Sequence, residues 1–256
     1  MAKSNPAISQ VLFIPDLHGE RPRLDEVVQS DAFQNACVAV QAGDFINGGG
    51  KDIIGTAERI YDLVRYRKNF FLCRGNHERA FAEMCRRIFA NDPERPPKAK
   101  DSMNPTLKEL GRLSDDDQEA FMRMMLDLYD NYSHDFYIVN EKIVLCHANW
   151  NDAILGCQDL TSYLDGTVVG GNLEDKNHAK DVIGAGWRRH DVKDDWHQPP
   201  REVKVFTGHY HVPKVRVEGD FGNIIRADTR CGKGGYLSVL EICAQTGQFS
   251  VTPYHR

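Results

Sequence analysis

The spacing of hydrophobic positions changes along the chain in a way that predicts alternating strands and helices. Three short apolar runs, at 10–16, 37–44 and 69–76, are predicted to be buried strands. Between them apolar residues recur every three or four positions, around Leu24 and again across 53–64, which is the spacing of a helix with one buried face. Continuous apolar strands separated by helices predict a parallel or mixed sheet that is covered on both faces.

The second part of the chain is less regular. An insertion at about 91–118 begins rich in proline and charge and is predicted to lie on the surface. Apolar runs then predict a hairpin across 136–149 and further strands near the end of the chain. The segment 157–201 is polar and glycine-rich and is predicted to be an irregular lid. We expect all of residues 1–256 to form one α/β domain.

The composition is that of an ordinary soluble globular protein, with 41% hydrophobic and 27% charged residues among 256. No apolar run is long enough to span a bilayer. The seven cysteines include no CxxC pair and are predicted to be reduced thiols of a cytoplasmic protein. The net charge of -5 does not indicate a nucleic-acid partner, although a local basic patch is compatible with it.

Side chains that can bind metal follow five of the predicted strands. Ligands of covered sheets bind at the carboxyl ends of the strands, so we expect these side chains to meet at one edge. Mixed oxygen and imidazole ligands favour manganese, iron, zinc or nickel over calcium. In chain order the candidates are Asp16 with His18, Asp44, Asn76 with His77, His147, and His209 with His211.

Each of these groups has a simpler explanation when it is taken alone. An aspartate after a strand is usually a turn or cap residue. His147 alone would be a core histidine, and His209 with His211 would be a surface pair. Because all the groups follow apolar strands in order, we favour a metal centre over these explanations.

The ordered set DLHG, GD, GNHE, HA and GHYH resembles the calcineurin-like metallophosphoesterase superfamily. Two further stretches, NPTLKELGR and RADTRCGKGGYLSVLEI, resemble its phage-type or bacterial branch of phosphoprotein phosphatases and symmetrical diadenosine tetraphosphatases. The resemblance covers most of the chain. It implies a four-layer sandwich in which two mixed β-sheets are flanked by helices.

The resemblance also implies two divalent metal ions, manganese being the first expectation and iron, zinc or nickel the alternatives. A hydroxide bridging the two ions would attack the phosphorus in line. His77 would donate a proton to the leaving oxygen. The ligands would be Asp16, His18 and His211 for one ion, Asn76, His147 and His209 for the other, and Asp44 for both.

The loop after Asp44 departs from the pattern of this branch. It reads GDFINGG instead of Gly-Asp-x-x-Asp-Arg-Gly. Asn47 therefore stands where an aspartate normally orients the catalytic histidine, and Gly48 stands where an arginine normally grips phosphate. The stretch GWRRHD resembles a segment that supplies a phosphate-binding arginine in phage-type relatives, which makes Arg189, with its neighbour Arg188, a candidate substrate ligand. The alternative is that both arginines are surface charges.

The predicted function is hydrolysis of a phosphate monoester in a phosphorylated small molecule, a nucleotide or a phosphoprotein. A phosphodiesterase or a dinucleoside polyphosphate hydrolase is the first alternative, because Gly48 replaces the arginine clamp. A catalytically weak protein that binds a nucleotide is the alternative from another class. The full ligand set argues against it, since a degenerate relative would be expected to lose ligands first.

Overall fold

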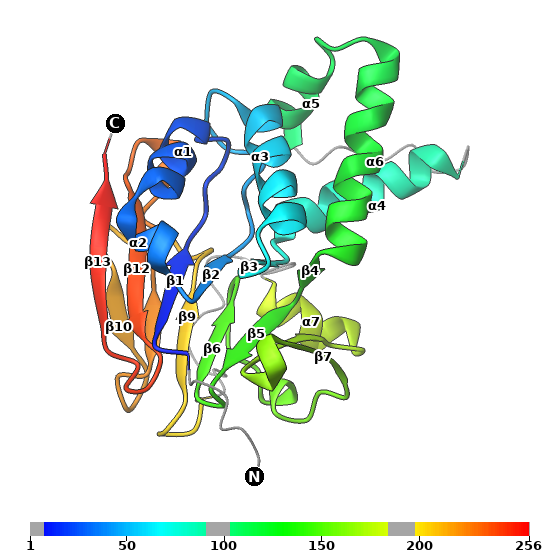
Figure 1. Cartoon of the computed structure of the whole chain (residues 1–256). Helices are drawn as coiled ribbons and strands as arrows, with labels where there is room; N and C mark the ends of the chain where they lie inside the picture. Colours follow the sequence, from blue (N-terminus) through cyan, green and yellow to red (C-terminus); the bar gives the residue numbers. More distant parts are fainter. Residues whose placement is uncertain (1–7, 91–102, 184–197, 256) are drawn as a thin grey trace.

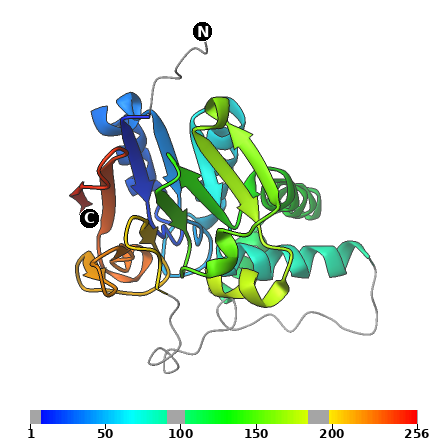
Figure 2. The ribbon, with the colours of Figure 1, turned by 90° about the horizontal axis from the view of Figure 1, so that it is seen from below.

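A computed structural model describes residues 8–90, 103–183 and 198–255, and it contains two mixed β-sheets flanked by helices, as the resemblance implied (Figure 1). One apolar core lies between the sheets. Phe13 and Val40 of the first sheet pack there with Leu145 and Phe206 of the second. Seen from below, helices lie on the outer sides of the two sheets, and the C-terminal strand forms one edge of the molecule (Figure 2).

The first sheet has the strand order β13-β12-β1-β2-β3-β4. The strands β1 to β4 run parallel, so the carboxyl ends of β1, β2 and β3 reach the same edge. β12 pairs antiparallel with β1 and with β13. The bounds are β1 (Gln10–Ile14), β2 (Val38–Gln41), β3 (Phe70–Cys73), β4 (Ser133–His134), β12 (Leu237–Cys243) and β13 (Phe249–Tyr254).

The second sheet has the order β10-β11-β9-β6-β5-β8-β7. β6 and β9 run parallel at its centre, so their carboxyl ends also lie together. The predicted hairpin is present as β5 and β6. The bounds are β5 (Phe136–Val139), β6 (Ile143–Cys146), β7 (Asp159–Tyr163), β8 (Val168–Asn172), β9 (Lys204–Thr207), β10 (Arg216–Glu218) and β11 (Ile224–Arg226).

Helices cover the outer faces of both sheets. Leu24, Ile60 and Phe81 of the first three long helices pack on the first sheet, whereas Val182 of the last helix packs on the second. The helices are α1 (Arg21–Gln29), α2 (Asp31–Asn35), α3 (Ile53–Tyr66), α4 (Asn76–Phe89), α5 (Asn104–Leu110), α6 (Asp115–Asn131) and α7 (Lys176–Val182), with 3₁₀ turns η2 (Asp152–Ile154), η3 (Leu164–Gly166) and η4 (Cys231–Lys233).

The segment 157–201 is more regular than the sequence predicted, because it contributes β7, β8 and α7. The prediction of an irregular lid is wrong for these elements. Gly170 and Gly171 lowered the strand signal, but the structure requires them. A Cβ atom on Gly170 would lie 2.6 Å from the His134 ring, and one on Gly171 would overlap the Phe136 ring. Because glycine has no side chain, the His134 and Phe136 rings can pack directly against the backbone of β8.

None of the described helices is long and apolar enough to cross a membrane. The cysteines, all of which lie in the described part of the chain, are free thiols.

Candidate metal centre

The turns that follow the strands bring the candidate ligands together. Asp16 and His18 follow β1, Asp44 follows β2, and α4 begins at Asn76 directly after β3. His18, Asp44 and His209 all have positive φ, at 51°, 52° and 59°. Such backbone is costly for residues other than glycine, and it tends to persist where surrounding contacts fix a functional site.

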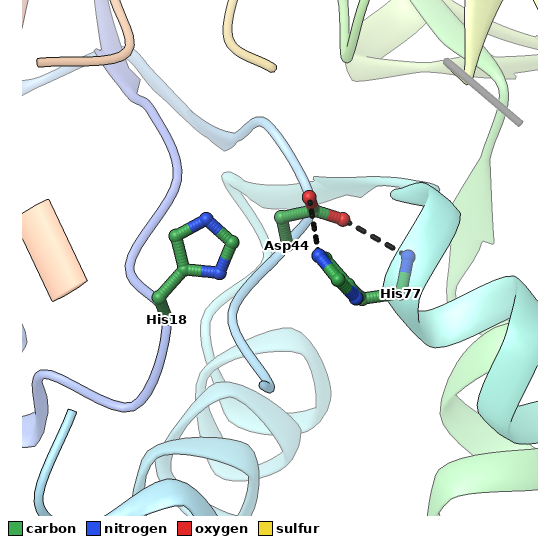
Figure 3. A group of neighbouring side chains, drawn as sticks. All are labelled: His18, Asp44 and His77. Atoms are coloured by element: carbon green, nitrogen blue, oxygen red, sulfur yellow. Dashed lines mark hydrogen bonds and ion pairs between the residues drawn. The ribbon is translucent and has the colours of Figure 1, made fainter. Parts of the chain in front are cut away.

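Asp44 lies at the middle of the centre, as Figure 3 shows for one half of it. It belongs to two groups of side chains whose ligand atoms all lie within 4.8 Å of one another: His18, Asp44 and His77, and Asp44, His147 and His209. Its Oδ2 lies 3.4 Å from His147 Nε2 and 3.5 Å from His77 Nε2. Its Oδ1 accepts the backbone N–H of His77 at 3.1 Å.

His147 presents one ring nitrogen to this centre. Its Nδ1 lies 2.9 Å from the Ala42 carbonyl oxygen, to which it must donate a hydrogen bond. Its Nε2 lies 3.1 Å from His209 Nδ1 and 3.2 Å from Asn76 Oδ1. Burial lowers the pKa of His147, but the carboxylates of Asp44 and Asp16 outweigh it and raise the pKa to about 10. Nε2 therefore faces a region in which the negative charges of Asp44 and Asp16 favour a cation.

Asp16 and His18 form the neighbouring part of the centre. Both oxygens of Asp16 lie within 3.1 Å of the His209 backbone nitrogen, whose N–H they accept. His18 Nε2 lies 4.0 Å from Asp16 Oδ2. Burial lowers the pKa of His18 and of His209 to about 3, which leaves both rings neutral, the form in which histidine binds metal.

His211 is placed differently from the other candidates. Within the described residues neither group of converging side chains includes it. Its Nε2 lies 3.1 Å from Asp228 Oδ2 and 3.3 Å from Lys233 Nζ. Burial raises the pKa of Asp16, and the negative charge of Asp228 raises it further. The assignment of His211 as a ligand of the first ion stays a prediction.

Asn47 and His77 are in contact, and a third residue fixes how they interact. The Thr106 hydroxyl accepts the Asn47 backbone N–H at 3.1 Å, so its own proton is donated to Asn47 Oδ1. This leaves Asn47 Nδ2 to face His77 Nδ1 at 3.1 Å. Because an amide nitrogen only donates, Nδ1 accepts, and the proton of the neutral ring lies on Nε2, toward Asp44.

The absence of an arginine at position 48 has a steric reason. Gly48 has a φ of +93°, and a Cβ atom on it would lie 2.6 Å from the Cβ of His18. Any side chain at this position would displace His18 from the centre.

Glu78 is a site residue that the sequence analysis missed, although it is the last residue of GNHE. It is buried, and its carboxylate accepts the backbone N–H groups of Asp44 at 2.8 Å and Ile46 at 3.1 Å. Burial and the charge of Asp44 raise the pKa of Glu78 to about 8. These two hydrogen bonds to Glu78 hold the turn at Asp44 in place.

Arg226 was also missed, and it ties together the two loops that carry His147 and His209. Its Nη1 donates to the Ala148 carbonyl at 2.7 Å and its Nη2 donates to Asn149 Oδ1 at 3.2 Å. Its guanidinium lies 4.5 Å from the centre of the Tyr210 ring, and the Tyr210 hydroxyl accepts from Asn149 Nδ2 at 2.8 Å. Long-range contacts of this kind leave no pattern in a sequence.

The donor set fits divalent metal ions. Asp16, Asp44 and Asp228 are buried within one small region, and crowding of buried carboxylates is unfavourable unless a cation compensates it. Neutral imidazoles and an amide oxygen complete the set, which is typical of transition-metal sites. The remaining candidates, Arg188 and Arg189, lie outside the described residues.

Comparisons with known proteins bear on the family and on the fold of this chain. The family model described as calcineurin-like phosphoesterase matches residues 9–223. No curated protein matches the sequence. A protein serine/threonine phosphatase from Saccharomyces cerevisiae has a similar structure, with a TM-score of 0.57 and 12% identity, over 99% of this chain and 82% of the yeast chain. A hypothetical protein from Pyrococcus horikoshii also has a similar structure, with a TM-score of 0.52 and 12% identity, over 96% of this chain and 88% of the Pyrococcus chain.

The structural neighbours show the fold, and the family match covers most of the chain. The chain therefore belongs to the calcineurin-like phosphoesterase family, whose members are metal-dependent hydrolases of phosphate esters.

Proposed function

We propose that this chain hydrolyses phosphate monoesters with two divalent ions at the centre around Asp44. The observation that carries the proposal is the position of Asp44, whose carboxylate converges with His18 on one side and with His147 and His209 on the other. The third member of the first group, His77, has a separate role as the proposed acid. Two bound ions would supply Lewis-acid stabilisation of the phosphoryl charge and an activated water nucleophile. Manganese is the ion that we expect, with iron, zinc or nickel as alternatives.

The protein's own contribution to metal binding is a set of ligands held by backbone contacts. Asp44 would serve both ions, and its turn is fixed by Glu78. The tautomer of His147 is fixed by the Ala42 carbonyl, which is the usual way in which a ligand histidine is oriented. The ligands would be Asp16, His18 and His211 for one ion and Asn76, His147 and His209 for the other.

His77 would act as the general acid. Asn47 and Thr106 place the ring proton on Nε2, which faces the centre beside Asp44. A leaving oxygen at the centre would therefore meet an N–H donor rather than a lone pair. The neutral ring can hydrogen-bond the leaving oxygen through this N–H, whereas full proton transfer would come from the imidazolium, in which Nδ1 is protonated as well.

The substrate would be a phosphorylated small molecule, a nucleotide or a phosphoprotein. The resemblance to phosphoprotein phosphatases favours a monoester. One observation favours a diester or a dinucleoside polyphosphate instead: Gly48 packs directly on His18, so no arginine can grip a terminal phosphate from that position.

The proposal is tested with p-nitrophenyl phosphate and its bis ester as the two substrates. We expect a metal-stripped sample to be inactive, manganese to restore activity, and the monoester to have the higher kcat/KM. A full rate in the presence of a chelator would refute metal dependence. Faster turnover of the bis ester would establish the diesterase alternative.

A further inference from the structure

A glycine-rich turn of the chain lies directly against the metal centre. A Cβ atom on Gly232 would overlap the Cβ of His18, and one on Gly49 would overlap the Gly232 carbonyl oxygen. The turn around Gly232 and the loop that contains Gly48 therefore both touch His18. The loop that contains Gly48 lacks the arginine of the phosphatase branch, and the turn around Gly232 carries Lys233.

The turn is held in place by a buried arginine. Arg23 is 2% exposed and donates through Nη1 to the Cys231 carbonyl at 3.1 Å and through Nη2 to the Gly235 carbonyl at 2.9 Å. The Lys233 backbone N–H donates to the Arg230 carbonyl at 2.9 Å. Both ends of the turn are therefore fixed, and the backbone of Lys233 has a defined position.

The side chain of Lys233 is exposed and its ammonium lies beside His211. Nζ lies 3.3 Å from His211 Nε2. Its charge is felt by two further residues. Burial is the main cause of the low pKa of His18, and the positive charge of Lys233 lowers it further. Burial raises the pKa of Asp228, and the charge of Lys233 opposes this rise.

We propose that Lys233 binds the phosphoryl group of the substrate and takes over the role of the arginine that Gly48 replaces. This inference rests on the proposed function. An ammonium is a point charge with three donors, so it binds a phosphate oxygen without the paired geometry of a guanidinium. A monoester near neutral pH carries more negative charge than a diester. Lys233 therefore favours monoesters over diesters, which counters the effect of Gly48.

The inference is tested by titrating inorganic phosphate into the manganese-loaded protein in a calorimeter. Lys233→Met should weaken phosphate binding about 10-fold, the size of one charge-assisted hydrogen bond, while manganese uptake stays as in the wild type. Lys233→Arg should keep most of the affinity. Lys214→Met, which removes an exposed charge a few residues after His211, is the matched control and should bind phosphate normally.

Four outcomes decide between the possibilities. Wild-type phosphate affinity in Lys233→Met would overturn the assignment, and so would a wild-type protein that binds no phosphate. A loss of manganese uptake in Lys233→Met would also overturn it, since the lysine would then act on the metal site. A wild-type protein that takes up no metal, yet binds phosphate in a Lys233-dependent way, would instead overturn the proposed function.

Discussion

His209 and His211 lie two residues apart on one loop and are held in different ways. The backbone N–H of His209 is bound by Asp16, its Nδ1 lies 3.1 Å from His147, and its ring meets Tyr210 edge-on at 4.9 Å. His211 instead faces the charged groups of Asp228 and Lys233, and 14% of its side chain is exposed.

The difference separates the centre into two halves. The half around His209 is held mainly by packing and by hydrogen bonds that involve the backbone. The half around His211 is built from charges, whose balance changes when a cation arrives. We therefore expect metal binding to rearrange the His211 half and to leave the His209 half nearly unchanged.

Asp44→Asn should give the largest effect, because Asp44 is shared by both groups of converging side chains. The substitution removes the negative charge and should lower metal content below two ions per chain. Activity should fall by at least about 100-fold, more than the usual cost of losing an outer partner of a metal ligand. Metal content measured by mass spectrometry checks this, and an Asp44→Asn variant that still holds two ions would exclude a bridging role.

Arg226→Met should give an intermediate effect that is confined to the His209 half. Loss of the contacts to Ala148, Asn149 and Tyr210 should weaken the manganese site of the His209 half about 10-fold to 100-fold in a calorimetric titration. The matched control is Arg67→Met, since Arg67 also stacks on an aromatic ring, Phe33, at 4.0 Å.

The control variant should keep the metal affinities of the wild type even if its free energy of unfolding falls. Equal weakening of both manganese sites in Arg226→Met would contradict the division of the centre into two halves.

Asn47→Asp should give the smallest effect, because it replaces a hydrogen bond by a charge without removing a ligand. The new carboxylate would accept from His77 Nδ1–H and favour the imidazolium, which raises the pKa of His77. The alkaline limb of the pH–rate profile should therefore move upward. A downward shift would show that Asn47 does not act on His77.

The prediction of buried strands alternating with helices was confirmed because continuous apolar runs carry a strong signal, and the two-sheet sandwich implied by the family resemblance was confirmed as well. The same signal pointed to the candidate ligands, since Asp16, Asp44 and His147 each follow such a strand. The strand β8 was missed because Gly170 and Gly171, which the neighbouring rings require, resemble loop residues in a sequence.

Residues that act through long-range contacts were also beyond sequence reasoning. Glu78 and Thr106 fall within the recognised stretches GNHE and NPTLKELGR, yet their roles depend on which backbone groups lie opposite them. Arg226 depends on three partners brought together from other strands and loops.

The pairing of β1 with β12 has a consequence for how the centre forms during synthesis. Gln10 on β1 bonds to Glu241 on β12, 231 residues away, and Asp16 binds the backbone of His209 across 193 residues. While the chain is still being made, Asp16, His18 and Asp44 have emerged but lack the histidines that complete them. Contacts of such long range form slowly, so the newly made protein passes through a period in which its acidic turns are exposed without their partners. We therefore expect metal capture to be a late event, coupled to closure of the first sheet.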